Sequence, residues 1–247
     1  MAKRGLAVVT GGSRGIGHGI AKELAEMGYD LFLLAKDPSR LKKTADELST
    51  KYKVKVDYFA CDLSDTGSID SFHKSLVSKK LIPDVLVSNA GVFLPGSTAD
   101  TKMELFDEMI AVNLKGMFYI TQKLMPLLAK GKDKRIILTS SIWALDSYPA
   151  EGREEATLYA ISKWAIRGWA RSLRAEVRKD NIGVTVIYPG ETFTDEWEGT
   201  TIPKERFMKP EDIGKIVRAV LSTSPQTVIE EVVVRPIKWS YPLKGWE

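Results

Sequence analysis

Short apolar runs alternate along this chain with longer segments in which apolar residues recur at helical spacing. Residues 5–10 are apolar and rich in β-branched residues and end at glycines, which is typical of a buried strand. In residues 16–27 the apolar positions recur every three to four residues, the period of a helix. The same reasoning predicts further strands at 30–35, 54–60, 85–88, 135–140, 183–188 and 230–235. It predicts a helix that begins at Asp37 and another from Ser64 to about Ser78. Further helices are expected at about 103–129, with a break near Asn113, at 158–179 and at 212–223.

This alternation predicts an α/β fold, in which a parallel sheet is covered by helices on both faces. No linker or composition shift divides the 247 residues, so we expect a single domain over residues 1–247. Ligands of such doubly wound folds bind at the carboxyl ends of the strands, where the strand order reverses. Motifs that follow predicted strands are therefore the first candidates for a functional site.

The first predicted strand ends in a glycine-rich turn, residues 10–17, with the sequence Thr-Gly-Gly-Ser-Arg-Gly-Ile-Gly. Glycines there permit a tight turn, let the backbone approach a pyrophosphate and let the helix pack on the strand. The following helix N-terminus offers free N–H groups to a phosphate. The spacing differs from G-x-G-x-x-G, and an ordinary glycine-rich turn is the alternative interpretation.

Tyr159 and Lys163 lie four residues apart on a predicted helix, so their side chains share one face. A nearby ammonium lowers the pKa of a phenol, as does the positive charge of an oxidised nicotinamide. Such a phenol can act as the acid in ketone reduction or the base in alcohol oxidation. For this pair alone, the alternative is an ordinary amphipathic helix face.

Taken together, the motifs resemble the signature of the short-chain dehydrogenase/reductase family from residue 5 to about residue 236. The resemblance is carried, in order, by the glycine turn of residues 10–17, Asn89-Ala90-Gly91, Asn113, Ser141, Tyr159-x-x-x-Lys163 and Pro189-Gly190. It implies a Rossmann-type sheet of seven parallel strands in the order 3-2-1-4-5-6-7. It also implies an enzyme that moves a hydride between NADP(H) and a carbonyl/secondary alcohol pair.

The chain departs from the family pattern at three places. Ser88 stands where an asparagine is usual, the segment between Ser141 and Tyr159 is longer than common, and residues 230–236 lack a glycine-rich ending. These departures remove no catalytic group, but they put the substrate in doubt.

The resemblance further implies a set of site residues. Tyr159 would be the general acid/base, Ser141 would polarise the substrate carbonyl, Asn113 would hold a water, and Lys163 would bond the nicotinamide ribose. The implied cofactor-binding residues are Gly11, Ser13, Arg14, Gly15, Ile16, Gly17, Lys36, Asp62, Leu63, Asn89, Ala90, Gly91, Tyr159, Lys163, Pro189, Gly190 and Thr194.

The end of the second predicted strand favours NADP over NAD. By resemblance, Ala35 occupies the position of the acid that would bond a ribose 2′-hydroxyl, and Lys36 and Arg14 occupy positions of phosphate-binding bases. Asp37 would repel the phosphate if it pointed inward, but it is also a suitable N-cap for the next helix. Asp62 either faces the adenine, as the resemblance implies, or is a turn residue.

Two segments without periodicity, at about 143–158 and 191–208, are expected to form substrate loops over the site. The aromatic C-terminal tail, residues 237–247, is expected to pack on the core or on another subunit. The long helices at 103–129 and 158–179 are apolar over a wide arc, which predicts a second partner. We therefore expect a homodimer or, by resemblance, a homotetramer.

Composition excludes several other classes of function. The net charge is +4 with both signs interspersed, so no nucleic-acid partner is expected. The single cysteine, Cys61, permits no intrachain disulfide, and residues 6–9 are too short for a signal or membrane segment, so we expect a cytoplasmic protein that binds no membrane.

His18 and His73 belong to no cluster with metal spacing and are expected on exposed turns, so no metal is predicted. Few Asn and Gln residues suggest a thermophilic source.

Two alternative functions fit the resemblance less well. A non-catalytic NADP-binding sensor on this fold usually lacks the tyrosine or the lysine, and both are present here. A sugar-nucleotide epimerase or dehydratase is usually longer and spaces its glycines G-x-x-G-x-x-G.

Overall fold

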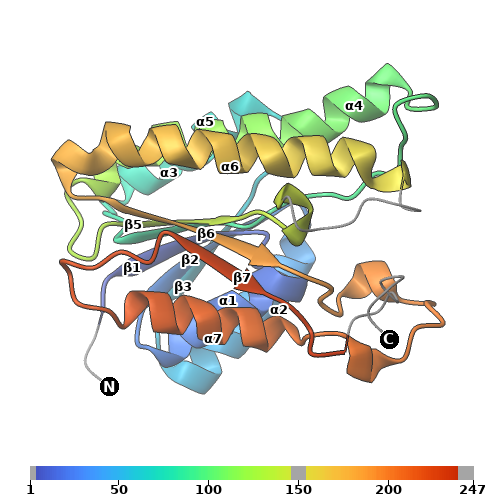
Figure 1. Ribbon diagram of the computed structural model, residues 1–247. Coiled ribbons are helices and arrows are strands. Elements are labelled where there is room, and N and C mark those ends of the chain that lie inside the picture. Colours follow the sequence, from blue (N-terminus) through green and yellow to red (C-terminus); the bar gives the residue numbers. More distant parts are fainter. Residues whose placement is uncertain (1–3, 146–153, 239–247) are drawn as a thin grey trace.

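The computed structural model describes residues 4–145 and 154–238 (Figure 1). Its strands are β1 (Leu6–Thr10), β2 (Asp30–Ala35), β3 (Val56–Ala60), β4 (Val85–Ser88), β5 (Arg135–Thr139), β6 (Gly183–Pro189) and β7 (Glu231–Val234). Its α-helices are α1 (Gly15–Glu26), α2 (Pro38–Tyr52), α3 (Thr66–Ser78), α4 (Met103–Ile110), α5 (Met117–Leu128), α6 (Thr157–Val177) and α7 (Pro210–Leu221). A π-helical turn, η1 (Ala111–Gly116), joins α4 to α5, and short 3-10 turns include η2 (Ile142–Ala144), η3 (Glu154–Ala156), η4 (Arg178–Asp180), η5 (Asp195–Trp197) and η6 (Lys204–Arg206).

The seven strands form one parallel sheet in the order β3-β2-β1-β4-β5-β6-β7, as expected from the sequence. From β1 the chain moves outward to β3, then returns to β4 and moves outward to β7 on the other side. The strand order therefore reverses between β1 and β4, and the carboxyl ends of these two strands flank the expected ligand site.

Both faces of the sheet are covered by helices, which explains why the strands are apolar runs rather than alternating ones. All five residues of β1 are buried, with Leu6 and Val8 in the core under α3, α5 and α6, and Ala7 and Val9 in the core under α1, α2 and α7. Figure 1 shows the two helical layers on opposite sides of the sheet.

Three local features differ from the sequence-based expectation. Helix α3 is capped by Asp65, whose side chain accepts a hydrogen bond from the Gly67 amide, and not by Ser64. The break expected near Asn113 is the π-helical turn η1, so the helical path continues. His18 and His73 are half-buried on α1 and α3 rather than exposed.

Some expected features lie outside the described residues. These are residues 146–153 of the expected substrate loop at about 143–158, and the aromatic tail from residue 239 onward. Within the described ranges, no helix is long and apolar enough to cross a bilayer. The described residues also contain no group of three or more His, Cys, Asp or Glu side chains that could hold a metal ion.

Candidate active site

A cavity of about 660 Å³ opens at the carboxyl ends of β1, β2, β4, β5 and β6. It brings together the glycine turn, the end of β2, the Asn89-Ala-Gly segment, Ser141, Tyr159, Lys163 and residues 189–192 and 194–197. Of the site residues expected from the sequence, Gly17, Asp62 and Asn113 do not line it. Each of these three instead contacts residues that do.

The glycine turn has a backbone that side chains would not tolerate. Gly15 adopts a φ of 51°, in the left-handed region that favours glycine. A Cβ at Gly17 would lie 2.1 Å from the carbonyl oxygen of Gly11, so only glycine lets α1 start this close to the turn. The turn is tied to β4 by Thr10, whose hydroxyl accepts hydrogen bonds from the amides of Asn89 (2.9 Å) and Ala90 (3.0 Å).

The N-terminus of α1 faces the cavity without a side-chain cap. Its N-cap residue, Arg14, makes no capping hydrogen bond, while Gly15 and Ile16 line the cavity. The first backbone N–H groups of a helix have no partner within the helix and carry partial positive charge. This end of the cavity is therefore suited to an anionic group such as a diphosphate.

Lys36 and Asp37, which follow β2 directly, both have partners in the structure. The ammonium of Lys36 lies 2.9 Å from a carboxylate oxygen of Asp62. Asp37 is the N-cap of α2, accepting hydrogen bonds from the amides of Ser39 (2.9 Å) and Arg40 (3.0 Å), which confirms the capping interpretation.

Although burial acts against it, hydrogen bonds from Ser64 and Lys36 hold the pKa of Asp62 below its usual value. Arg40, which sequence reasoning did not single out, also lines the cavity.

The serine, tyrosine and lysine of the sequence motif converge at the other end of the cavity. Ser141 follows β5, caps η2, and forms a side-chain hydrogen bond with Tyr159. Lys163 lies one helical turn after Tyr159 on α6, with its ammonium 5.3 Å from the centre of the phenol ring. The hydroxyl of neighbouring Ser140 instead donates to the backbone carbonyl of Lys163 (3.0 Å), a structural contact.

Burial dominates the electrostatics of this pair. Lys163 is 3% exposed, its ammonium donates to the carbonyl of Thr139 (3.3 Å), and burial lowers its pKa from 10.5 to about 8, opposed by the negative charge of Glu196. Burial raises the pKa of Tyr159, with the hydrogen bond from Ser141 acting in the opposite direction. Burial therefore outweighs the lowering of the Tyr159 pKa that the sequence predicts.

Asn113 lies in η1, behind the cavity wall, and is fully buried. Its side chain accepts from the amide of Val92 (2.8 Å) and donates to the carbonyl of Val92 (2.9 Å) and to Ser162 (3.2 Å). A Cβ at Gly91 would lie 3.1 Å from the Asn113 side-chain oxygen and 3.5 Å from the Lys163 ammonium. Asn113 thus anchors the segment after β4 against α6, next to Lys163.

The segment at 191–208, expected as a substrate loop, covers one side of the cavity. Its two ends are joined, since the amide of Phe193 donates to Met208 (2.9 Å) and that of Met208 to Glu191 (3.0 Å). Inside it, the ring of Phe207 packs against Phe193 and Trp197, with centroids 5.6 and 4.8 Å apart. An aromatic cluster therefore gives the loop a core of its own.

Thr194, which is expected to contact the cofactor, lines the cavity. It lies close to the glycine turn, since a Cβ built on Gly15 would be 3.1 Å from the methyl group of Thr194. Asp195 and Glu196, which follow it, line the cavity too, and sequence reasoning missed them. It also missed Phe93, whose ring packs edge-on against Tyr159 at 5.3 Å. These residues lie in loops, where no periodicity marks a functional position.

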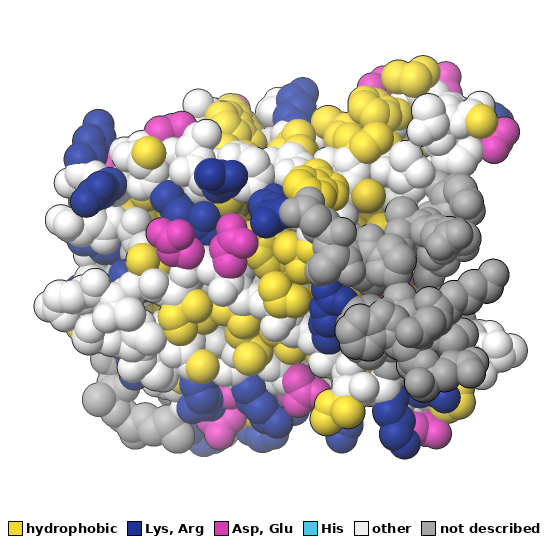
Figure 2. All heavy atoms as spheres, in the orientation of Figure 1, with side chains coloured by type: hydrophobic (Ala, Val, Ile, Leu, Met, Phe, Trp, Pro, Cys, Tyr) yellow, Lys and Arg dark blue, Asp and Glu magenta, His cyan; other side chains and the backbone are white. Residues whose placement is uncertain are grey.

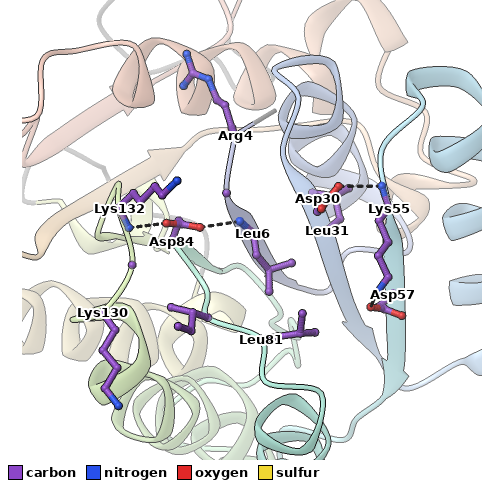
Figure 3. Close-up of a pocket in the computed structure, with 13 residues that line it drawn as sticks. Arg4, Leu6, Asp30, Leu31, Lys55, Asp57, Leu81, Asp84, Lys130 and Lys132 are labelled. Atoms are coloured by element: carbon purple, nitrogen blue, oxygen red, sulfur yellow. Dashed lines mark hydrogen bonds and ion pairs between the residues drawn. The ribbon is translucent and has the colours of Figure 1, made fainter. Parts of the chain in front are cut away.

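A second cavity, of about 320 Å³, lies at the amino ends of β1 to β4, opposite the candidate active site (Figure 3). Asp84 lines it and accepts hydrogen bonds from the amides of Leu6 (2.8 Å) and Lys132. Asp30 similarly accepts from the amide of Lys55. The carboxylates of Asp84 and Asp30 therefore hold neighbouring chain segments together, which is a structural role.

Comparison with known proteins agrees with this geometry. The family model described as short chain dehydrogenase matches residues 5–203. The chain therefore belongs to the short-chain dehydrogenase family and is an oxidoreductase of that class.

Among curated relatives, an uncharacterised oxidoreductase of Staphylococcus epidermidis is 31% identical over 235 residues, covering 95% of this chain and 98% of the relative. A sepiapterin reductase of Chlorobaculum tepidum is 30% identical over 240 residues, covering 94% and 96%.

Solved structures show the same fold with nicotinamide cofactors. An alcohol dehydrogenase from the archaeon Thermococcus sibiricus, complexed with 5-hydroxy-NADP, has a TM-score of 0.86 and 31% identity, covering 97% of this chain and 99% of that one. L-sorbose reductase from Gluconobacter frateurii, complexed with NADPH and L-sorbose, has a TM-score of 0.85 and 25% identity, covering 96% and 97%. These cofactors are in keeping with the one expected from the sequence.

Proposed function

We propose that this protein is an NADP(H)-dependent oxidoreductase that interconverts a carbonyl compound and a secondary alcohol, with Tyr159 handling the proton. The observation that carries the proposal is the shared cavity. One end has the uncapped helix N-terminus suited to a diphosphate, and the other has Ser141, Tyr159 and Lys163 in contact.

The residues present fit such a cofactor. The turn from Gly11 to Gly17 would receive the diphosphate, because its glycines leave the backbone amides accessible. Lys163 would bond the nicotinamide ribose, and Thr194 would contact the nicotinamide amide. NADP-bound and NADPH-bound relatives support this choice of cofactor. When bound, the nicotinamide supplies or accepts the hydride.

The chain's own groups then orient the substrate and move the proton. Ser141 donates a hydrogen bond to the substrate oxygen, which polarises the carbonyl. The phenol of Tyr159, whose pKa is raised above its ordinary value by burial, carries its proton near neutral pH and can donate it to the oxygen during reduction. The ammonium of Lys163, 5.3 Å from the ring centre, stabilises the negative charge left on the phenol.

Replacing Tyr159 with phenylalanine tests this proposal. Tyr159→Phe should lose at least about 100-fold in turnover, the scale of a positioned acid or base. NADPH binding, followed by its fluorescence, should persist. Tyr119→Phe is a matched control, because that hydroxyl donates to Asp70 and does not line the cavity. Turnover of Tyr159→Phe close to that of the wild type would contradict the proposal and favour a non-catalytic binding protein.

We also propose that the chain forms homo-oligomers. Figure 2 shows apolar side chains gathered over the middle of the face that carries α6 and β7. Ile161 and Trp164 of α6 are 46% and 41% exposed, Phe118 of α5 is 46% exposed, and Val233 of β7 is 50% exposed. Large exposed apolar side chains are typical of a surface that another chain covers.

A further inference from the structure

Glu196 is a carboxylate at the catalytic end of the active-site cavity to which the proposed reaction gives no role. It is the middle residue of the turn η5, it lines the cavity, and its side chain is exposed. Its negative charge raises the pKa of both Tyr159 and Lys163. Glu196 therefore lies close enough to the acid/base pair to act on a substrate held there.

The residues on either side of Glu196 fix its position. Two guanidinium groups contact the carboxylate of Asp195, from Arg14 at 3.3 Å and from Arg40 at 3.1 Å. The ring of Trp197 packs into the aromatic cluster of the loop at 191–208, with a centroid distance of 4.8 Å. Glu196 is thus held between two anchored neighbours, which places its carboxylate before any substrate binds.

Unlike Asp195, Glu196 has no hydrogen-bond or ion-pair partner within the part of the chain that the structure describes. The protein packed around its carboxyl partly desolvates it and raises its pKa, although the positive charges of Arg14 and Lys163 act in the opposite direction. A partly desolvated carboxylate without a donor costs free energy, and a ligand that donates a hydrogen bond to it removes that cost. The cavity therefore contains an acceptor that is available to the substrate.

The surrounding charges discriminate among the polar groups that a carbonyl substrate could bring to this acceptor. A substrate carboxylate would be repelled by Glu196. A substrate ammonium would be attracted by Glu196 but repelled by Lys163 and Arg14, whose charges act at the same place. A hydroxyl donates a hydrogen bond without a net charge, so it meets neither repulsion.

We propose that Glu196 accepts a hydrogen bond from a hydroxyl group next to the substrate carbonyl, so that the preferred substrates are hydroxy ketones and the matching vicinal diols. The proposal rests on the proposed function for the place of the carbonyl, which is next to Ser141 and Tyr159. It makes Glu196 a specificity-determining residue that favours hydroxylated ketones over plain ketones and over keto acids.

Three small ketones that differ in one group test the proposal. Hydroxyacetone carries a hydroxyl where butanone carries a methyl, and pyruvate carries a carboxylate on the carbonyl carbon. Saturation-transfer difference NMR on the full chain with oxidised NADP measures their affinities without turnover, because the oxidised cofactor has no hydride to give. The wild type should bind hydroxyacetone about tenfold more tightly than butanone, the effect of one charge-assisted hydrogen bond.

Two substitutions at Glu196 should change this order in opposite directions. Glu196→Leu removes the acceptor and should abolish the preference for hydroxyacetone over butanone. Glu196→Gln keeps an acceptor oxygen without the charge and should retain part of the preference. Both variants should bind pyruvate about two- to fivefold more tightly than the wild type, because an exposed charge no longer repels it. General damage to the site would weaken all three ketones together.

Glu198→Leu is the matched control, because Glu198 lies in the same loop but outside the cavity lining, and it should leave all three affinities unchanged. With NADPH, the ratio of kcat/KM for hydroxyacetone to that for butanone should follow the same order. This ratio cancels any effect of Glu196 on Tyr159 and Lys163, since both ketones would use the same acid.

A wild type that binds butanone as tightly as hydroxyacetone, or a Glu196→Leu variant that keeps the preference, would overturn the proposal. Tighter binding of aminoacetone than of hydroxyacetone would also overturn it and would favour an ammonium site. Because the NMR experiment requires no turnover, these outcomes are separate from a failure of Tyr159 as the acid/base.

Discussion

Replacement of Lys163 by methionine should make the protein more stable near neutral pH while abolishing its activity. Methionine keeps a flexible apolar stem of similar length but carries no charge. Lys163 is 3% exposed, and burial lowers its pKa to about 8. Near pH 7 the folded protein therefore holds a buried ammonium at a cost in stability that the variant does not have.

The magnitude follows from the two pKa values. The difference between 10.5 in the unfolded chain and about 8 in the folded one corresponds to about 3 kcal/mol of destabilisation when the amine is charged. The variant also loses the hydrogen bond to the carbonyl of Thr139, which costs about 1 kcal/mol. We therefore expect Lys163→Met to be about 2 kcal/mol more stable than the wild type at about pH 7.

The sign reverses at high pH. Between about pH 8 and 10.5 the unfolded wild type binds more protons than the folded one, so wild-type stability rises with pH. The advantage of Lys163→Met should shrink over this window, and near its upper end only the loss of the hydrogen bond should remain.

Urea denaturation followed by tryptophan fluorescence, repeated across this pH range, measures the difference between variant and wild type. Lys115→Met, at an exposed lysine of η1, is the control and should change stability little at any pH. A Lys163→Met variant that is less stable near pH 7, by an amount independent of pH, would refute the argument that burial of a charge dominates.

Three further predictions concern cofactor choice, stability and assembly. Lys36→Asp should shift the preference from NADPH toward NADH by about tenfold in kcat/KM, because it places an anion near the expected 2′-phosphate, and equal use of both cofactors by the wild type would contradict this. Asp84→Ala should lower the free energy of unfolding by about 2–4 kcal/mol in urea titrations, because the amides of Leu6 and Lys132 lose their acceptor, with NADPH binding retained. Light scattering at micromolar concentration should give a multiple of 27.5 kDa, and a monomer mass would disprove the proposed interface.

Local pattern was sufficient for most secondary structure. The apolar run at the first strand predicted β1 within one residue, because a strand buried on both faces leaves no room for alternation. The error at the start of α3 shows the limit of such reasoning. Asp62, Ser64 and Asp65 are all suitable N-caps, and the choice depends on contacts outside the segment. Asp62 pairs with Lys36 and holds Ser64, which leaves Asp65 to cap the helix.

The candidate site was predictable where motif residues are close in sequence. Tyr159 and Lys163 share a helix face because four residues make about one turn. The glycine turn was likewise recognisable, since its backbone demands are local. Arg40 could have been noticed as a cation in the first turn of α2. Phe93 and Glu196 could not, because nothing in a loop sequence shows which side chains face a cavity.

The order of strands and helices, the glycine turn and the tyrosine–lysine pair follow from the amino-acid sequence alone, because backbone geometry repeats over a few residues. The meeting of Arg14, Arg40 and Asp195 depends on the tertiary structure, since the carboxylate lies 181 and 155 residues from them along the chain. The tertiary structure also places Tyr159 where burial raises the pKa of its phenol. Burial excludes water from the phenol and depends on the packing of segments that are distant in sequence, so no local sequence pattern predicts it.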